Sequence, residues 1–268
     1  MTESSRLARA FERARNEDRP ALITLVVPGF PAAVETDAVF DAMVEGGADI
    51  IEVEIPFSDP LADGATIQGV VYEALTQGTT PDDCIDFVRR ARGRHPELPI
   101  VFMTYLNPVL AYGLERFAAA AAEAGADAAI LTDLPPEEAT EAKTALAKAG
   151  LDLILLVAPT SSDARVELIC RQASGFIYCV SVAGVTGARD QLPADLNAFL
   201  ARVRRCTNLP LAVGFGMSRR EHVEALHGVA DGAVVGSAIM NVISASEPQE
   251  RAKAVREYVE VLSGRRRP

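Results

Sequence analysis

The 268-residue sequence has few of the residues that build metal sites and disulfide frameworks. Its four cysteines (Cys84, Cys170, Cys179 and Cys206) lie far apart and form no C-x-x-C pair, and the three histidines are not spaced as metal pairs. Such spacing suits neither a zinc site nor a disulfide-rich scaffold. We therefore expect no metal ion, reduced thiols and a cytoplasmic protein.

Basic residues and long apolar runs are also scarce. The 26 Lys and Arg residues stand against 37 Asp and Glu residues, for a formal net charge of −11. A surface for nucleic acid or anionic lipid needs basic patches, so this balance argues against both. The longest apolar run, LILLVA at 153–158, is too short to span a membrane, and residues 1–19 lack the apolar centre of a secretory signal. An acidic protein can still hold a phosphate through backbone N–H groups.

One pattern repeats along the chain: a short apolar, β-rich run, a turn, and an amphipathic helical stretch. Strict alternation of this kind requires parallel strands with right-handed crossovers. Eight units in about 250 residues fit a closed (β/α)₈ TIM barrel, and the segment around 4–16 predicts an extra N-terminal helix over its bottom. The predicted strands cover 21–27, 49–55, 99–105, 127–133, 151–158, 175–182, 210–216 and 232–238.

Two further features bear on this fold. An open, doubly wound sheet also alternates, but it predicts G-x-G-x-x-G after the first strand, where this chain has TLVVPGFPAA. No Gly-, Ser- or Pro-rich linker divides the sequence, so we expect residues 1–268 to form a single barrel domain.

Glycine-rich turns follow the last three predicted strands. They read GVTGAR at 184–189, GFGMS at 214–218 and GSA at 236–238. TIM barrels commonly bind phosphate near the last strands, where glycine lets the backbone approach an anion and a helix start supplies N–H groups. The candidate phosphate-binding residues are Gly187, Gly216, Gly236 and Ser237.

Acidic residues crowd the second strand and the loop after it, in the stretch IEVEIPFSDPLADG at 51–64. Alternation puts Glu52 and Glu54 on one face of that strand. A buried Glu near the mouth of a barrel, with its pKa raised by apolar surroundings, is suited to proton transfer near neutral pH. Two structural alternatives stay open: a salt bridge to a nearby Lys or Arg, or exposure at a sheet edge.

The stretch IEVEIPFSDPLADG resembles the signature of the tryptophan synthase α chain family. The resemblance runs through nearly the whole chain, in family order: ATIQGVVYEAL, MTYLNPVLAYG, TDLPPEEA, APTSSDAR, GFIYCVSVAGVTGAR, GFGMS and VVGSAI. It implies a (β/α)₈ barrel that cleaves indole-3-glycerol phosphate to indole and glyceraldehyde 3-phosphate by a retro-aldol reaction. It also implies that no metal or organic cofactor is needed.

The same resemblance assigns roles to individual residues. Glu52 matches the acid/base that protonates indole C3 and then helps to remove the glycerol hydroxyl proton, and Asp63 matches the acceptor of the indole N–H. Asp59 matches a residue at the contact with a tryptophan synthase β chain, the partner in an α2β2 assembly. The residues that match positions lining the substrate site are Tyr105, Tyr178, Thr186 and Phe215.

Several positions depart from the family pattern, and they cluster at the expected barrel mouth. Glu54 stands where the family usually has Gly, Val26-Val27-Pro28 where Gly-Asp-Pro is typical, and Ala65 replaces a Pro. Val182-Ala183 stands where polar or basic residues are common. Three interpretations remain open: an α subunit working with a β chain, a stand-alone lyase that feeds another pathway, or a catalytically impaired paralogue that binds a phosphate ligand and regulates a partner.

Overall fold

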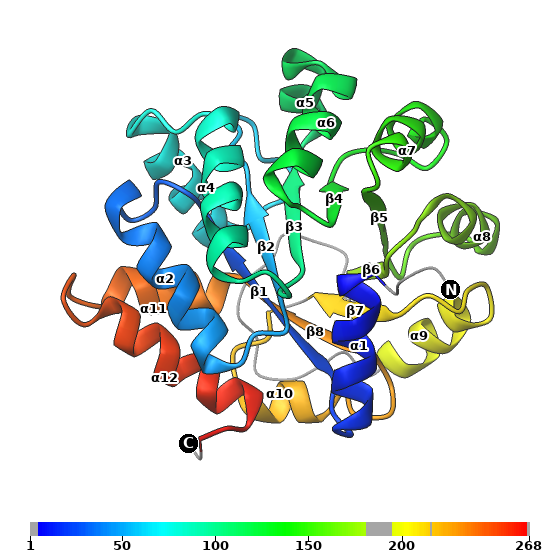
Figure 1. Cartoon of the computed structure of the whole chain (residues 1–268). Helices are drawn as coiled ribbons and strands as arrows, with labels where there is room; N and C mark the ends of the chain where they lie inside the picture. The colour runs from blue at the N-terminus through cyan, green and yellow to red at the C-terminus, as the bar shows by residue number, and fades with distance from the viewer. Residues whose placement is uncertain (1–4, 181–194, 215, 267–268) are drawn as a thin grey trace.

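A computed structural model describes residues 5–180, 195–214 and 216–266. Within these residues eight parallel strands form a closed barrel in chain order, because β1 pairs with both β2 and β8. Figure 1 shows the strands at the centre of a ring of helices. The strands are β1 (Ala21–Val26), β2 (Ile50–Glu54), β3 (Ile100–Thr104), β4 (Ala128–Leu131), β5 (Asp152–Val157), β6 (Ile177–Val180), β7 (Leu211–Gly214) and β8 (Gly232–Val235).

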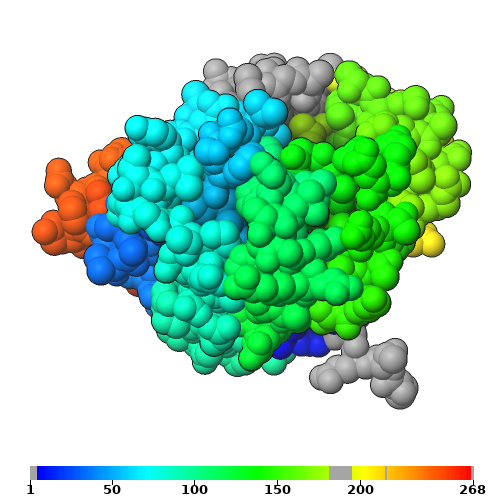
Figure 2. All heavy atoms as spheres, turned by 90° about the horizontal axis from the view of Figure 1, so that it is seen from above, coloured from blue at the N-terminus to red at the C-terminus, as the bar shows by residue number. Residues whose placement is uncertain are grey.

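The helices lie outside the strands, and Figure 2 shows part of this layer as a continuous wall of side chains. They are α1 (Arg6–Asn16), α2 (Ala33–Gly46), α3 (Ala65–Thr76), α4 (Pro81–Arg94), α5 (Leu106–Tyr112), α6 (Leu114–Ala124), α7 (Ala139–Lys148), α8 (Asp163–Gln172), α9 (Leu196–Arg204), α10 (Arg220–Glu224), α11 (Ser237–Ala245) and α12 (Arg251–Ser263). The alternating order confirms the predicted (β/α)₈ barrel.

The barrel strands are buried on both faces, which explains why their sequences are almost wholly apolar. Every residue of β1, β2, β3, β4, β7 and β8 is buried. Outside them, α6 packs through the small side chains of Ala118, Ala121 and Ala124. A polar side chain on a strand of this barrel therefore has to lie either in the lumen or beneath a helix.

Helix α1 covers the end of the barrel where the strands begin. Leu7 and Phe11 are buried, and the Phe11 ring meets the ring of Phe176, next to the start of β6, at a centroid distance of 5.6 Å. Ser5 caps the helix, since its hydroxyl accepts a hydrogen bond from the backbone N–H of Ala8 at 3.2 Å. The predicted N-terminal helix over the barrel bottom is confirmed.

Three local features differ from what the sequence suggests. Helix α5 was not predicted, because Pro108 obscures it; proline is tolerated there because it lies in the first turn. The sequence pattern after the last strand suggests one helical stretch, but the structure has two helices there, α11 and α12, which are separated near Pro248. His222 is buried although charged residues surround it in the sequence, and its Nδ1 accepts a hydrogen bond from the N–H of Ser218 at 3.3 Å.

No helix among the described residues is long and apolar enough to cross a membrane.

All strands run in the same direction, so their carboxyl ends meet at one mouth of the barrel. Glu54, Gly214 and Val235 end β2, β7 and β8 there. This mouth is where side chains from distant parts of the sequence come together.

Candidate active site

A small cavity of about 70 Å³ lies at the carboxyl-terminal mouth of the barrel. Glu52 from β2 and Asp63 from the loop before α3 line it together, as do residues that follow β7 and β8. The described lining residues are Leu25, Glu52, Asp63, Ile67, Met103, Tyr178, Gly214, Gly216, Met217, Val234, Gly236, Ser237 and Ala238. The two predicted catalytic carboxyls thus lie at one site with most of the predicted phosphate-binding residues.

Glu52 is held in the middle of β2, where Leu25 of β1 and Val101 of β3 flank it in register. Its side chain is buried, and among the described residues Oε1 has no hydrogen-bond partner. Burial raises the pKa of Glu52 to about 8, because the apolar surroundings penalise the charged form. Glu52 therefore carries a proton at neutral pH and is able to deliver it.

Asp63 lies in a different environment, at the end of the loop after β2. The Tyr105 hydroxyl donates to Asp63 Oδ2 at 2.7 Å and accepts from the backbone N–H of Ala62 at 2.9 Å. The Asp63 backbone carbonyl accepts from Gln68 Nε2 at 2.9 Å. Burial raises the pKa of Asp63, and the hydrogen bond from Tyr105 opposes that rise by stabilising the carboxylate. Two carboxyls in unequal surroundings are able to divide an acid role and a charge-stabilising role.

Neither structural alternative for the β2 acids holds in the described residues. A closed barrel has no sheet edge at which Glu52 or Glu54 is exposed, and both side chains are buried. Within those ranges no salt bridge joins either carboxyl to a Lys or Arg. Keeping two unpaired acids in a core costs free energy, so their presence indicates a use.

The cost of burying Glu52 predicts a pH-dependent stability. The carboxyl holds its proton up to about pH 8 in the folded chain and releases it near 4.5 in the unfolded chain. Relative to Glu52→Gln, the wild type is therefore most stable below the unfolded-state pKa of 4.5. It loses that stability as the pH rises from there through the folded-state pKa of about 8. We expect Glu52→Gln to gain up to about 5 kcal/mol over wild type between pH 4.5 and 8.5. Urea denaturation of both proteins at the two pH values measures it.

The control for that measurement is Glu73→Gln, which changes an exposed glutamate on α3. Because this side chain is exposed, the substitution should change the free energy of unfolding little. A stability difference between Glu52→Gln and wild type that is the same at both pH values would contradict a buried, protonated Glu52.

The other side of the cavity is formed by the start of a helix and a turn. Helix α11 starts directly after β8, its N-cap is Gly236, and no side chain caps its first N–H groups. Gly236, Ser237 and Ala238 at this helix start line the cavity, as does Gly216 in the turn after β7. Uncapped helix-start amides carry partial positive charge and are ready donors to phosphate.

A glycine at the end of β7 makes room for Tyr178. A Cβ at position 214 would lie 2.3 Å from the Tyr178 hydroxyl, so no larger residue fits while that ring keeps its place. The ring lines the cavity, and burial raises the pKa of Tyr178 well above its ordinary value, with the nearby acids adding to the effect. Tyr178 therefore presents a neutral hydroxyl.

The remaining predicted residues have mixed placements. Tyr105 is not among the residues that line the cavity, but its hydroxyl donates a hydrogen bond to Asp63, which does line it. Asp59 is exposed on the loop after β2, where it accepts a hydrogen bond from the Ser58 hydroxyl at 2.7 Å. Three predicted residues lie outside the described residues: Thr186, Gly187 and Phe215.

Sequence reasoning missed the apolar lining of the cavity. Leu25, Met103 and Val234 point into it from β1, β3 and β8, and Ile67, Met217 and Ala238 add to it. Strand alternation combined with register was the available signal, because Leu25 pairs with Glu52. These side chains offer the apolar walls that an aromatic ring needs.

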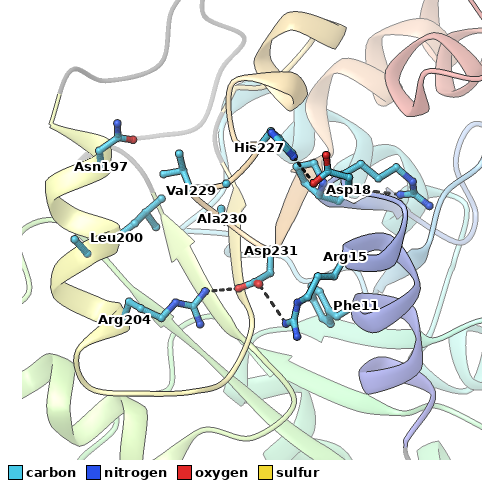
Figure 3. A pocket seen from close by; sticks show the side chains of 14 residues that line it. Phe11, Arg15, Asp18, Asn197, Leu200, Arg204, His227, Val229, Ala230 and Asp231 are labelled. Atoms are coloured by element: carbon cyan, nitrogen blue, oxygen red, sulfur yellow. Dashed lines mark hydrogen bonds and ion pairs between the residues drawn. The ribbon is translucent and has the colours of Figure 1, made fainter.

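A larger groove, of about 620 Å³, lies at the opposite end of the barrel and is shown in Figure 3. Asp231 there bonds to Arg204 and to Arg15, and His227 pairs with Asp18 at 2.9 Å. Its charged side chains form ion pairs, and the two carboxyls described above are not part of it. Size alone therefore does not mark the active site.

In the described ranges, no three His, Cys, Asp or Glu side chains gather as metal ligands.

Comparison with known proteins decides the family. The family model described as "Tryptophan synthase alpha chain" matches residues 11–265. The chain belongs to the tryptophan synthase α chain family. The tryptophan synthase alpha chain of Roseiflexus castenholzii is 50% identical over 97% of this chain and 100% of its own length.

Solved structures agree with this family. A chain in a structure of Mycobacterium tuberculosis tryptophan synthase superposes with a TM-score of 0.89 at 36% identity, over 98% of each chain. A chain of the tryptophan synthase complex from Pyrococcus furiosus gives a TM-score of 0.84 at 36% identity, over 92% of this chain and 98% of that one. Family membership and the paired carboxyls indicate a carbon–carbon lyase.

Proposed function

We propose that the chain cleaves indole-3-glycerol phosphate to indole and glyceraldehyde 3-phosphate, with Glu52 and Asp63 as the catalytic carboxyls. The observation that supports the proposal most strongly is the cavity itself. It has an unpaired, buried glutamate, a tyrosine-held aspartate and the uncapped start of α11 on its walls. Those three features suit an aromatic ring that needs a proton, a ring N–H that needs an acceptor, and a phosphate.

Glu52 acts first as the acid. It holds a proton at neutral pH and transfers it to C3 of the indole ring, which leaves a positively charged indolenine. The resulting Glu52 carboxylate then takes the proton from the glycerol hydroxyl on the carbon attached to the ring. As that hydroxyl becomes the aldehyde, the bond to C3 breaks and its electrons restore the aromatic indole.

Asp63 stabilises the charge that this protonation creates. Its carboxylate accepts the indole N–H, and the Tyr105 hydroxyl holds it in place at 2.7 Å. A fixed negative group beside a developing positive charge lowers the barrier without reorganising during the reaction. Leu25 and Met103 place apolar side chains around the same space.

Ser237 offers a direct test of the phosphate end. Ser237→Ala removes one hydroxyl donor and leaves the helix amides, so we expect the Kd of a non-cleavable indole-3-alkyl phosphate to rise about 5- to 30-fold. The rate at saturating substrate should change much less. Isothermal titration calorimetry and steady-state kinetics measure the two quantities.

The matched control is Ser244→Ala on the same helix. The Ser244 hydroxyl donates to the carbonyl of Met240, and the residue is exposed away from the cavity. An equal loss of affinity in both variants, or none in Ser237→Ala, would put the anion elsewhere.

A β-chain partner is proposed for the same mouth. Leu61, on the loop after β2, is 85% exposed, and Leu110, on α5 after β3, is 54% exposed. The loop is tied to the end of β3 through Ala62 and Tyr105, so the two leucines belong to adjacent parts of the rim, with Asp59 beside Leu61. Exposed large apolar side chains around a mouth favour a protein contact. The related P. furiosus structure is itself of a complex.

Steady-state cleavage of indole-3-glycerol phosphate, with and without an added tryptophan synthase β chain, tests this function. A slow rate that the β chain strongly raises is the expected result for an α subunit of an α2β2 enzyme. A high rate without partner would favour a stand-alone lyase, and no cleavage in either condition would leave a phosphate-binding regulator.

The four cysteines are unpaired thiols, which suits the reducing cytoplasm that we propose as the location of the protein.

A further inference from the structure

Glu54 is a third carboxyl at the mouth, and the chemistry above does not use it. It lies two positions after Glu52 on β2, so both side chains project from the same face of the strand. Glu54 is 2% exposed, and within the described residues its Oε2 has no hydrogen-bond partner. An unpaired buried carboxyl is costly, so its presence indicates a use.

The titratable groups that interact electrostatically with Glu54 are acids, two tyrosine hydroxyls and a thiol. Asp63 and Glu52 act on it from its own loop and strand, Tyr105 follows β3, and Tyr178 lies on β6. From the helix layer, Cys84 on α4 is close enough to interact electrostatically with the Glu54 carboxyl. Burial first, and then Asp63 and Glu52, raise the pKa of Glu54 well above its ordinary value. Three carboxyls in one enclosed space cannot all ionise near neutral pH.

We propose that Glu54 is a positioning residue that stays protonated and donates a hydrogen bond to Glu52 once Glu52 has given its proton to the substrate. This inference rests on the proposed function. The two carboxyls are able to reach each other. Residues two positions apart on a strand are separated by about 6.6 Å, and each glutamate side chain has rotatable bonds between Cα and its carboxyl group. Oε1 of Glu52 and Oε2 of Glu54 are both available, since neither has another partner in the described ranges.

Donation from Glu54 stabilises the Glu52 carboxylate at the stage when it must wait for the glycerol hydroxyl proton. The pair exchanges protons with its substrate through Glu52, which lines the cavity, while Glu54 does not. A neutral neighbour lowers the pKa of Glu52, whereas an ionised neighbour raises it. The direction in which the pKa of Glu52 changes when Glu54 is removed therefore shows whether Glu54 is neutral or ionised.

The pH dependence of cleavage provides the first test. Activity should fall at high pH as Glu52 loses the proton that it must donate. We expect Glu54→Ala to move this alkaline limb up by about one pH unit, because the carboxylate loses its donor. Glu54→Gln keeps an N–H donor and should restore most of the difference. Movement of the limb to lower pH in Glu54→Ala, or the same position in all three proteins, would overturn the proposal.

Infrared spectroscopy of ligand-free protein labelled with ¹³C-glutamate tests the proton directly and needs no activity. At pH 7 the wild type should show one more protonated-carboxyl C=O band than Glu54→Gln, and this band should persist after the band assigned by Glu52→Gln has titrated away. Absence of that extra band would overturn the proposal, even if cleavage is normal. If the wild type shows this band but does not cleave indole-3-glycerol phosphate, the proposed function is rejected, while the protonated state of Glu54 is supported.

Discussion

Glu52→Gln is expected to lower kcat for indole-3-glycerol phosphate cleavage by about 10³-fold, since general acid–base catalysis is worth roughly 10²- to 10⁴-fold. Gln has the shape of a protonated Glu but neither delivers nor accepts the reaction's proton. Because the side chain is fully enclosed and keeps its volume, the fold should be retained. The rate is measured as release of glyceraldehyde 3-phosphate at saturating substrate.

The affinity of the same variant for a non-cleavable indole-3-alkyl phosphate separates chemistry from binding. We expect that Kd to stay within about threefold of wild type, since the ligand needs no proton. Glu73→Gln, on the exposed face of α3, controls for an unspecific effect of the substitution. Near-normal turnover in Glu52→Gln would show that another group supplies the proton.

Asp63→Asn is expected to have the second largest effect, a fall in kcat/KM of about 10²-fold. The amide has nearly the same shape, but it has no negative charge to stabilise the protonated ring, and its NH₂ group opposes the ring N–H. Steady-state kinetics of the purified variant measure the loss.

Tyr105→Phe is the matched partner of that variant. It removes the 2.7 Å hydrogen bond to Asp63 Oδ2 and leaves the charge, so its effect should be smaller than that of Asp63→Asn. If Tyr105→Phe is impaired as much as Asp63→Asn, the position of Asp63 matters more than its charge. If both variants retain normal kcat/KM, Asp63 has no part in the reaction.

The barrel was predictable from the sequence because buried parallel strands leave a strong signal. Runs such as ALITLVV and PIVFMTY are apolar on both faces, and each is followed by a helical stretch, so the strand count fixes the architecture. The same regularity placed Glu52 and Glu54 on one face of β2. Helix α5 escaped prediction because it is a single short helix with Pro108 in its first turn.

Contacts between distant residues were less accessible. Nothing in the sequence indicates that the Tyr105 hydroxyl holds Asp63, since that contact depends on how the loop after β2 folds over the end of β3. His222 has charged neighbours in the sequence, yet it is buried, and its ring accepts a hydrogen bond from the Ser218 N–H. Such placements depend on tertiary structure that no local pattern encodes.

A crystal structure of the chain with a non-cleavable indole-3-alkyl phosphate tests the central claim most directly. The account predicts the phosphate on the Gly236 and Ser237 amides at the start of α11, with the indole ring between the Glu52 and Asp63 carboxyls and its N–H directed at Asp63. A phosphate bound at the Arg15–Arg204 groove, or an indole ring outside the barrel mouth, would contradict it.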